Sequence, residues 1–364
     1  MSTLENLPRE IISLICSLLE QPEKYNCIYV NKELYSASIP ELWREPILPS
    51  TKALHQLIKC LHHSKHQRGD YIRVIRLGCF VGINDEELLS LLPLIPNLEV
   101  LELRQAEQLT DKSLIPVSRY CKQLKQFGVK RALATYRTMH YLGGCVELQR
   151  LTLAACPNLT PMALLPFAHL PIEHLDLSGC KWLTASDTAR DLCSLEHLTS
   201  LSLICCDVIS ADFLHQLTGA LIHLQDFSIT GNAVIEDDAV IPFLKTHPNL
   251  HGLFLLECAI TDATLKAIGQ YLPNLHHLDI SFCTRVTTRG VRDLVFQCPH
   301  LKLLGVKYCG IVAHDFPELQ IDEIELDTLN YIKLDQIRNH HQEEESIRES
   351  YAYIHQFLST EQVH

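Results

Sequence analysis

Apolar residues recur along most of the chain with one spacing. Each block begins with an apolar residue and has further apolar residues three and five positions after it. Many blocks also have a Cys eight positions after that first residue. The segments IEHLDLSGCKWLT (172–184) and LHHLDISFCTRVT (275–287) show the pattern. Successive blocks begin 24 to 26 residues apart, at Ile72, Leu98, Leu124, Leu148, Ile172, Leu198, Leu224, Leu250, Leu275 and Leu301. This regular step predicts an internal repeat.

Each block predicts a strand followed by a helix. Two apolar residues in alternation place their side chains on one face of a strand. The apolar set that follows, as in DATLKAIGQYL (262–272), recurs every three or four residues and is typical of a helix. Thr261 and Asp262 stand where a helix N-cap is expected. Because neither element can bury its apolar side alone, we expect an α/β solenoid with parallel strands on a concave face and helices on a convex face.

Two parts of the array depart from the pattern. Block 124–147 lacks the Cys and the apolar-Thr pair, so we expect its turn and helix to be irregular. After Cys309 the last unit is short, and 321–334 predicts a terminal strand that closes the array. The tail, 332–364, places Ile347, Tyr351, Ile354 and Leu358 on one helical stripe. That helix either caps the solenoid or binds a partner.

The recurring cysteines stand at one position of the block. They are Cys156, Cys180, Cys206, Cys258, Cys283 and Cys309, and Asn232 replaces the Cys in one block. A small apolar side chain is needed where the chain leaves the strand, and a free Cys behaves as a small buried hydrophobe. The alternative is metal binding, which needs clustered ligands that one Cys per repeat does not supply. We therefore expect structural filler and no metal site.

These blocks resemble the cysteine-containing subclass of leucine-rich repeats, and the resemblance covers about 72–331. It implies the solenoid fold and a binding surface, and it assigns no particular activity.

The first 49 residues follow another pattern. Pro8 suits the first turn of a helix, and Ile11, Leu14, Ile15, Leu18 and Leu19 fall on one wide apolar face. Pro22 is expected to end this helix, and Asn31 to cap a third helix after a short second one. A module this small buries little surface. Its apolar residues either form its own core or remain exposed for a partner.

The order LPREI, CIYVNK and LWR over residues 4–48 resembles an F-box of the fungal style. The resemblance implies docking onto a Skp-family adaptor, and through it onto the cullin and RING subunits of an SCF-type ubiquitin ligase. The positions that match the family's adaptor-contacting and closing residues are Leu7, Pro8, Ile11, Ile15, Leu18, Leu19, Val30, Leu42 and Trp43. Residues 50–71 are expected to form a helical linker to the repeats.

Two groups on the concave face are candidates for target binding. The basic group is Arg76, Arg104, Lys130 and Arg131, and the aromatic group is Phe254, Leu256, Phe282, Lys307 and Tyr308. Exposed aromatic residues on adjacent strands suit an interface hot spot. The alternatives are solvated charge paired with Glu102 for the first group and packing beneath the tail helix for the second. Asp176 and Asp279 occupy equivalent places and are interpreted as repeat-consensus residues.

Composition excludes several classes. The 364 residues carry a net charge of −12, which argues against a general nucleic-acid binder. No apolar run approaches a membrane span and no signal peptide is visible, so the 15 Cys are expected to be reduced thiols in the cytoplasm or nucleus. No nucleotide-binding, hydrolase or metalloprotease motif is present, so we expect no catalytic residues and no cofactor. The expected role is target recognition for ubiquitin-dependent degradation. A ligase-independent interaction protein or inhibitor, and an oligomerising scaffold, remain alternatives.

Overall fold

A computed structural model describes residues 7–63, 67–231, 233–319 and 325–340. The chain divides into two compact units, Met1–His197 and Leu198–His364. Among the described residues, no helix combines the length and apolar character needed to cross a membrane.

The first unit opens with three helices, α1 (Arg9–Leu18), α2 (Gln21–Cys27) and α3 (Lys32–Arg44). Helix α1 packs on α3 around a small core of Ile12, Cys16, Leu34 and Ala37. Asn31 caps α3 as expected, because its side chain accepts a hydrogen bond from the Leu34 N–H. The expected role of Pro22 is wrong, since α1 ends before it and Pro22 lies in the first turn of α2.

The segment expected to be a linker is packed against the first repeat. Helix α4 (Thr51–His63) buries Leu54, Leu57 and Leu61, and its His55 contacts Glu87 of the first repeat. After the short helix η2 (Arg68–Tyr71), the Arg73 N–H donates to the Arg44 carbonyl at the end of α3, at 2.9 Å. The helical module is therefore hydrogen-bonded directly to the first repeat.

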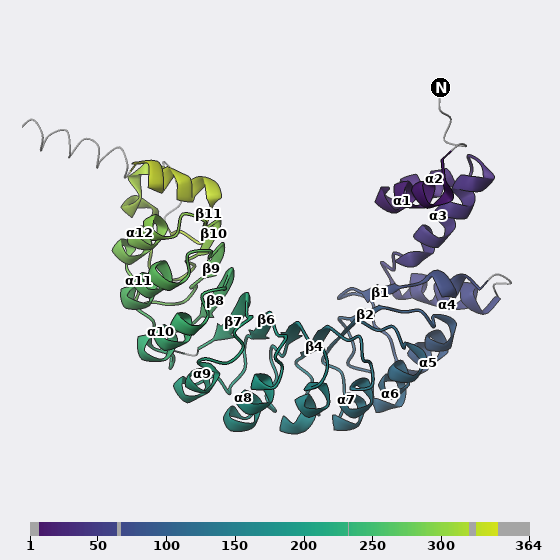
Figure 1. Cartoon of the computed structure of the whole chain (residues 1–364), viewed down its shortest axis with the longest axis horizontal. Helices are drawn as coiled ribbons and strands as arrows, with labels where there is room; N and C mark the ends of the chain where they lie inside the picture. The colour runs from purple at the N-terminus through teal and green to yellow at the C-terminus, as the bar shows by residue number, and fades with distance from the viewer. Residues whose placement is uncertain (1–6, 64–66, 232, 320–324, 341–364) are drawn as a thin grey trace, which may run out of the picture. The chain divides into compact units, whose positions relative to one another are not determined.

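The repeats of the first unit alternate strand and helix. The strands are β1 (Val74–Leu77), β2 (Val100–Leu103), β3 (Gln126–Lys130), β4 (Arg150–Ala154) and β5 (His174–Asp176), all parallel. The helices are α5 (Asp85–Leu91), η3 (Leu92–Leu94), α6 (Asp111–Tyr120), α7 (Tyr136–Leu142), η4 (Pro161–Phe167) and α8 (Ala185–Cys193). In Figure 1, α5, α6 and α7 lie on one side of these strands. In each unit, the side of the strands away from the helices is termed the open strand face.

The second unit continues the same pattern. Its parallel strands are β6 (Ser200–Leu203), β7 (Asp226–Thr230), β8 (Gly252–Leu256), β9 (His277–Asp279) and β10 (Leu303–Gly305). Its helices are α9 (Ala211–Leu217), α10 (Asp237–Thr246), α11 (Asp262–Tyr271), α12 (Thr288–Gln297), η5 (Ala313–Asp315) and η6 (Pro317–Leu319). The terminal strand expected at 321–334 is present as β11 (Thr328–Asn330), which pairs antiparallel with β10.

The end of the second unit is capped. Residues 331–340 are helical and bury Leu334 and Ile337. Arg338 donates to the carbonyls of Val295, Cys298 and Leu301 at 2.9 to 3.2 Å. The first two lie at the end of α12, where carbonyls have no partner within the helix. The beginning of the tail therefore acts as a cap. The expected stripe at Ile347, Tyr351, Ile354 and Leu358 lies outside the described residues.

The recurring apolar and cysteine positions form the core. The first residue of every block is 0 or 1% exposed, and the six recurring cysteines are buried as expected. Some of these S–H groups also donate to the neighbouring repeat: Cys180 donates to the Leu153 carbonyl and Cys309 to the Ile280 carbonyl, both at 3.0 Å. Burial raises the pKa of each of these two thiols to about 12, so they stay protonated at neutral pH. Asn232 lies outside the described residues.

Adjacent repeats are joined by an aspartate and a threonine. The first residue of a repeat helix accepts hydrogen bonds from the Thr that caps the next helix, in the pairs Asp85–Thr110, Asp111–Thr135, Asp237–Thr261 and Asp262–Thr287. Block 124–147 takes part through Thr135, and its α7 is a short, regular α-helix. The expected irregularity there is wrong. It falls instead in the next block, where Pro161 and Pro166 leave only the 3₁₀ helix η4.

Candidate protein-binding surfaces

The helical module turns part of its apolar surface outward. On α1, Ile11 is 43% exposed and Leu18 is 79% exposed, whereas Ile12 between them is only 3% exposed and belongs to the core. Leu14 and Val30 are also exposed. Isolated exposed apolar residues are ordinary, but a group of them on one small module marks an interaction site. We call the exposed apolar residues of α1, α2 and their connections the outer apolar face.

The nine residues expected to contact an adaptor divide by exposure. Leu7, Pro8, Ile11, Leu18 and Val30 are exposed, and Ile15, Leu19, Leu42 and Trp43 are half-buried. The Arg68 guanidinium lies 5.3 Å from the centre of the Trp43 ring, so Trp43 also contacts the segment that leads to the first repeat.

The sequence interpretation missed several members of this face. Tyr25 and Tyr29 are both exposed and lie one helical turn apart, with their hydroxyl oxygens 2.7 Å apart. The hydrogen bond with Tyr25 raises the pKa of Tyr29. Their spacing of four residues was the available signal, because such pairs share one side of a helix. Tyr35 on α3 and Ile47 after α3 lie outside this face and are exposed as well, and no periodic pattern in the sequence distinguishes them.

A pocket of about 820 Å³ lies between the helical module and β1. Its lining mixes the cations Lys24, Arg44 and Arg76 with the carboxylates Glu41 and Glu45. The charges partly neutralise one another, since Arg76 pairs with Glu45 at 2.5 Å. Because these charges pair with one another, the pocket is better explained as a contact region between the helical module and the first repeat than as a ligand site.

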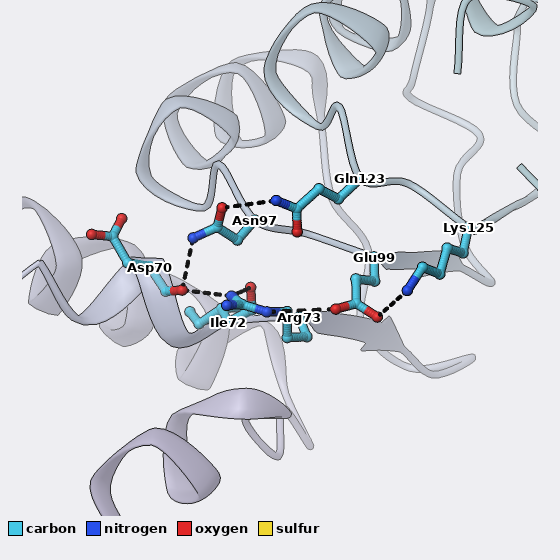
Figure 2. Close-up of polar contacts among 7 residues, drawn as sticks. All are labelled: Asp70, Ile72, Arg73, Asn97, Glu99, Gln123 and Lys125. Atoms are coloured by element: carbon cyan, nitrogen blue, oxygen red, sulfur yellow. Dashed lines mark hydrogen bonds and ion pairs between the residues drawn. The ribbon is translucent and has the colours of Figure 1, made fainter. Parts of the chain in front are cut away.

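A polar ladder continues this contact region along the first repeats, as Figure 2 shows. Arg73 donates to the Asp70 carbonyl at 2.5 Å and lies 3.5 Å from Glu99, which lies 3.3 Å from Lys125. Asn97 also donates to the Asp70 carbonyl, at 3.0 Å. The ladder ties η2 to three successive repeats.

The basic group lies on the open strand face of the first unit, and all four side chains are exposed. Arg76 also pairs with Glu102 at 3.0 Å, and Arg131 with Glu107 at 3.2 Å. Within the described ranges, Arg104 and Lys130 make no ion pair. The group therefore contains two balanced cations and two that are available to a partner.

The aromatic group lies on the open strand face of the second unit. Phe254 and Leu256 are half-buried on β8, while Phe282 and Tyr308 are exposed just after β9 and β10, with ring centroids 4.9 Å apart. The Lys307 Nζ lies 5.2 Å from the Tyr308 ring centre and 3.4 Å from Asp327. The terminal helix over 331–340 leaves both rings exposed.

The remaining candidate residues have structural roles. Asp176 and Asp279 accept hydrogen bonds from the backbone N–H two residues later, as expected for repeat-consensus residues. In the part of the chain that the structure describes, no three His, Cys, Asp or Glu side chains are placed to hold a metal ion.

Family comparisons agree with this architecture. Residues 4–81 match the COS11 F-box domain, and residues 271–295 match a leucine-rich repeat. The chain carries an N-terminal F-box followed by leucine-rich repeats.

Individual relatives share parts of this F-box and repeat chain. F-box protein COS111 of Yarrowia lipolytica is 39% identical over 75 residues, which cover 21% of this chain and 13% of that protein. F-box/LRR-repeat protein 12 of Arabidopsis thaliana is 27% identical over 147 residues, covering 38% and 37% of the two chains. The chain thus spans well under half the length of these curated relatives.

Among solved structures, a chain from the complex of Rad7 and Elc1 in yeast is similar over 83% of this chain and 84% of its own length. The TM-score is 0.57 and the identity is 17%, so this similarity supports the fold alone.

Proposed function

We propose that this chain is a substrate-recognition subunit of an SCF-type ubiquitin ligase, acting in the cytoplasm or nucleus. In this role the F-box docks onto a Skp-family adaptor, and the open strand face of the repeats binds the target protein. The cullin and RING subunits join through the adaptor. No catalysis is required of this chain, because ubiquitin transfer takes place elsewhere in the complex.

The observation that carries the proposal is the division of α1 into two sides. Ile12 and Cys16 form the module's core, while Ile11, Leu14 and Leu18 remain outside it. Because burial of these side chains would stabilise a module with so small a core, the outer apolar face favours a protein partner. An inhibitor without a ligase would have no need to keep this face uncovered.

The complex in which a structurally similar chain was solved gives weaker support. The structurally similar yeast chain was solved in a complex of Rad7 and Elc1. By analogy, one end of the present chain is free to hold an adaptor while the repeats hold a target.

The test is binding of the full chain to a purified Skp-family adaptor, measured by calorimetry. An Ile11→Asp, Leu18→Asp double variant places two charges on the outer apolar face and is expected to weaken binding about a hundredfold or more, because hot-spot side chains dominate such interfaces. The matched control is a Val146→Asp, Met162→Asp double variant. Those two apolar residues are 66% and 56% exposed on the repeats. The control is expected to bind as wild type.

Circular dichroism of both double variants establishes that they fold. If the wild-type chain binds no Skp-family adaptor, the proposed role in a ubiquitin ligase is wrong. A ligase-independent interaction protein is then favoured. Equal loss in the two double variants would show that the outer apolar face is not the docking site.

A further inference from the structure

The aromatic group of the second unit lies within an ordered set of side chains. Glu257, Phe282 and Tyr308 occupy the same position in three successive repeats, and all three have left-handed backbone, with φ of 54°, 66° and 56°. The Glu257 N–H donates to the Ser281 carbonyl at 3.0 Å and the Phe282 N–H to the Lys307 carbonyl at 2.7 Å, so the three backbones are direct neighbours. A carboxylate, a phenyl ring and a phenol ring thus form one row.

The repeat itself accounts for the backbone conformation, but it does not account for these side chains. Ala155 and Gly179 stand at the same repeat position in the first unit and are also left-handed, with φ of 51° and 72°. Glycine is the residue best suited to this conformation. The repeat therefore needs no large group at this position, yet Phe282 and Tyr308 place two rings in solvent.

A second carboxylate, that of Asp279, lies on the strand that leads to Phe282. Asp279 on β9 accepts from the Ser281 N–H and hydroxyl through Oδ1, which leaves Oδ2 to accept from a partner. Its neighbour on β10 is Gly305, where an added Cβ would lie 2.5 Å from the Asp279 Oδ1. A residue without a side chain at 305 is what keeps this carboxylate uncovered.

The charges around the rings are unbalanced. Lys307, whose Nζ lies 5.2 Å from the Tyr308 ring centre, is paired with Asp327. Glu257 is exposed and makes no ion pair within the described residues, and Asp279 is half-buried on β9, three residues before Phe282. Two exposed rings, with Glu257 in the same row and Asp279 on the strand that leads to Phe282, favour a cation that stacks on a ring while it pairs with a carboxylate. Arginine does both, because its guanidinium is planar and carries a fork of donors.

We propose that this surface binds a target segment in which an arginine stands beside an apolar residue. The guanidinium stacks on Phe282 and pairs with Glu257 or Asp279, and the apolar neighbour packs on Tyr308. The inference rests on the proposed function, since it assigns a class of target to the repeats of the same receptor.

The test is selection of random peptides displayed on phage against the immobilised full chain. Peptides with an arginine next to an aromatic or aliphatic residue are expected to be enriched. A Phe282→Gly, Tyr308→Gly double variant is expected to bind a selected synthetic peptide about tenfold more weakly or worse, in line with loss of hot-spot side chains. Because glycine suits left-handed backbone, this variant removes the rings without disturbing the fold.

The matched control is Ala155→Gly, which makes the same kind of backbone change at the same repeat position and removes no ring. It is expected to bind the peptide as wild type does. Glu257→Arg is expected to abolish the preference for arginine. No enrichment, enrichment of acidic peptides, or equal binding by the double variant would overturn the proposal.

Other occupants of the surface are separated by crosslinking the chain alone. A benzoylphenylalanine at position 308 is expected to give no crosslink after irradiation without peptide. A crosslink to residues 341–364, or to a second copy, would overturn the proposal by showing that the chain itself covers the rings. The adaptor-binding measurement is independent, so failure of the ligase role and failure of this surface give different results.

Discussion

At the residue scale, the aspartate–threonine pair is a side-chain contact that recurs between adjacent repeats. Asp237 accepts three hydrogen bonds across the repeat boundary, from the Thr261 N–H at 2.9 Å, the Thr261 hydroxyl at 2.6 Å and the Thr264 hydroxyl at 2.5 Å. Burial alone would raise the pKa of Asp237, but these hydrogen bonds outweigh it and lower the pKa below its usual value. The same balance lowers the pKa of Asp85 and Asp111.

Asp237→Asn tests this contact. The substitution keeps the size of the side chain but replaces one acceptor oxygen with a donor that faces the Thr261 groups, and we expect a loss of about 2 kcal/mol in the free energy of unfolding at neutral pH. Urea unfolding measures it. Asp238→Asn is the control, because Asp238 is the next residue of the same first helical turn and is exposed, and its loss should stay within about 0.5 kcal/mol.

The same pair predicts how stability depends on pH. Because the folded-state pKa of Asp237 is lowered, its contribution is fully present above the unfolded aspartate pKa of about 3.9 and is lost as the pH falls through the lower folded value. The difference in stability between wild type and Asp237→Asn is therefore expected to shrink as the pH falls below about 4. Urea unfolding over an acidic pH series checks this. A difference that is constant through that range would show that the carboxylate charge does not matter.

Residue roles were predictable from the sequence where they depend on local spacing. The six buried cysteines follow from their fixed place in the block, and Thr261 caps its helix as expected. The bonds that Asp262 accepts from Thr287 in the next repeat were not predicted. Two residues 25 positions apart become neighbours only through the stacking of repeats, and one sequence carries no direct record of that contact.

At the element scale, α1 shows why an apolar pattern does not say which side is the core. The pattern predicts one wide face through Ile11, Leu14 and Leu18, but the residues buried within the module are Ile12 and Cys16. In the sequence, an apolar residue that contacts another protein cannot be told from one that packs in the core. The distinction requires the position of α3, against which α1 packs.

Ile12→Ala and Leu14→Ala separate the two sides of α1. Ile12 is 3% exposed and its truncation is expected to cost about 2–4 kcal/mol, because it leaves a cavity in a small core. Leu14 is 58% exposed, and its truncation is expected to change stability by less than about 0.5 kcal/mol. Limited proteolysis and urea unfolding of the full chain measure the difference. Similar losses in both variants would contradict the assigned core.

The cap on α12 makes a second prediction at this scale. Arg338→Met removes the donors to three carbonyls but keeps much of the apolar stem, and we expect a loss of about 2–3 kcal/mol in the stability of the last repeats. Arg289→Met on α12 is the control, because the Arg289 side chain is 90% exposed, and it should have little effect. Hydrogen exchange of α12 amides measures both. Unchanged protection in Arg338→Met would show that the carbonyls are satisfied without it.

Proline positions were the least predictable feature of the elements. Pro22 begins a helix instead of ending one, and Pro40 lies inside α3. Proline removes one backbone donor, which costs little in a first turn and is tolerated within a helix where packing compensates. Sequence shows where the donor is missing. It does not show whether α1 and α2 pack well enough on α3 to hold the helix together.

At the scale of the whole molecule, each repeat is stabilised by contacts with the repeats next to it. Each repeat contributes one strand and one helical segment, and the stability of such an array is a sum of repeat and interface contributions. Helix α4 is the element that covers the first repeat from the side of the F-box, with His55 on Glu87 of α5. The segment expected to be only a linker thus takes the place of a capping repeat.

This role of α4 gives a prediction about the spread of unfolding. Leu54 is fully buried on α4, and Leu54→Ala is expected to cost about 2–5 kcal/mol locally. If contacts pass only between neighbours, hydrogen exchange should accelerate in α4, β1 and α5 while β8 and α11 in the second unit keep their protection. Lys52→Ala, on the exposed side of α4, is the control and should change neither region. Loss of protection in the second unit as well would mean that the array unfolds as one cooperative body, and the F-box would then depend on every repeat for its own stability.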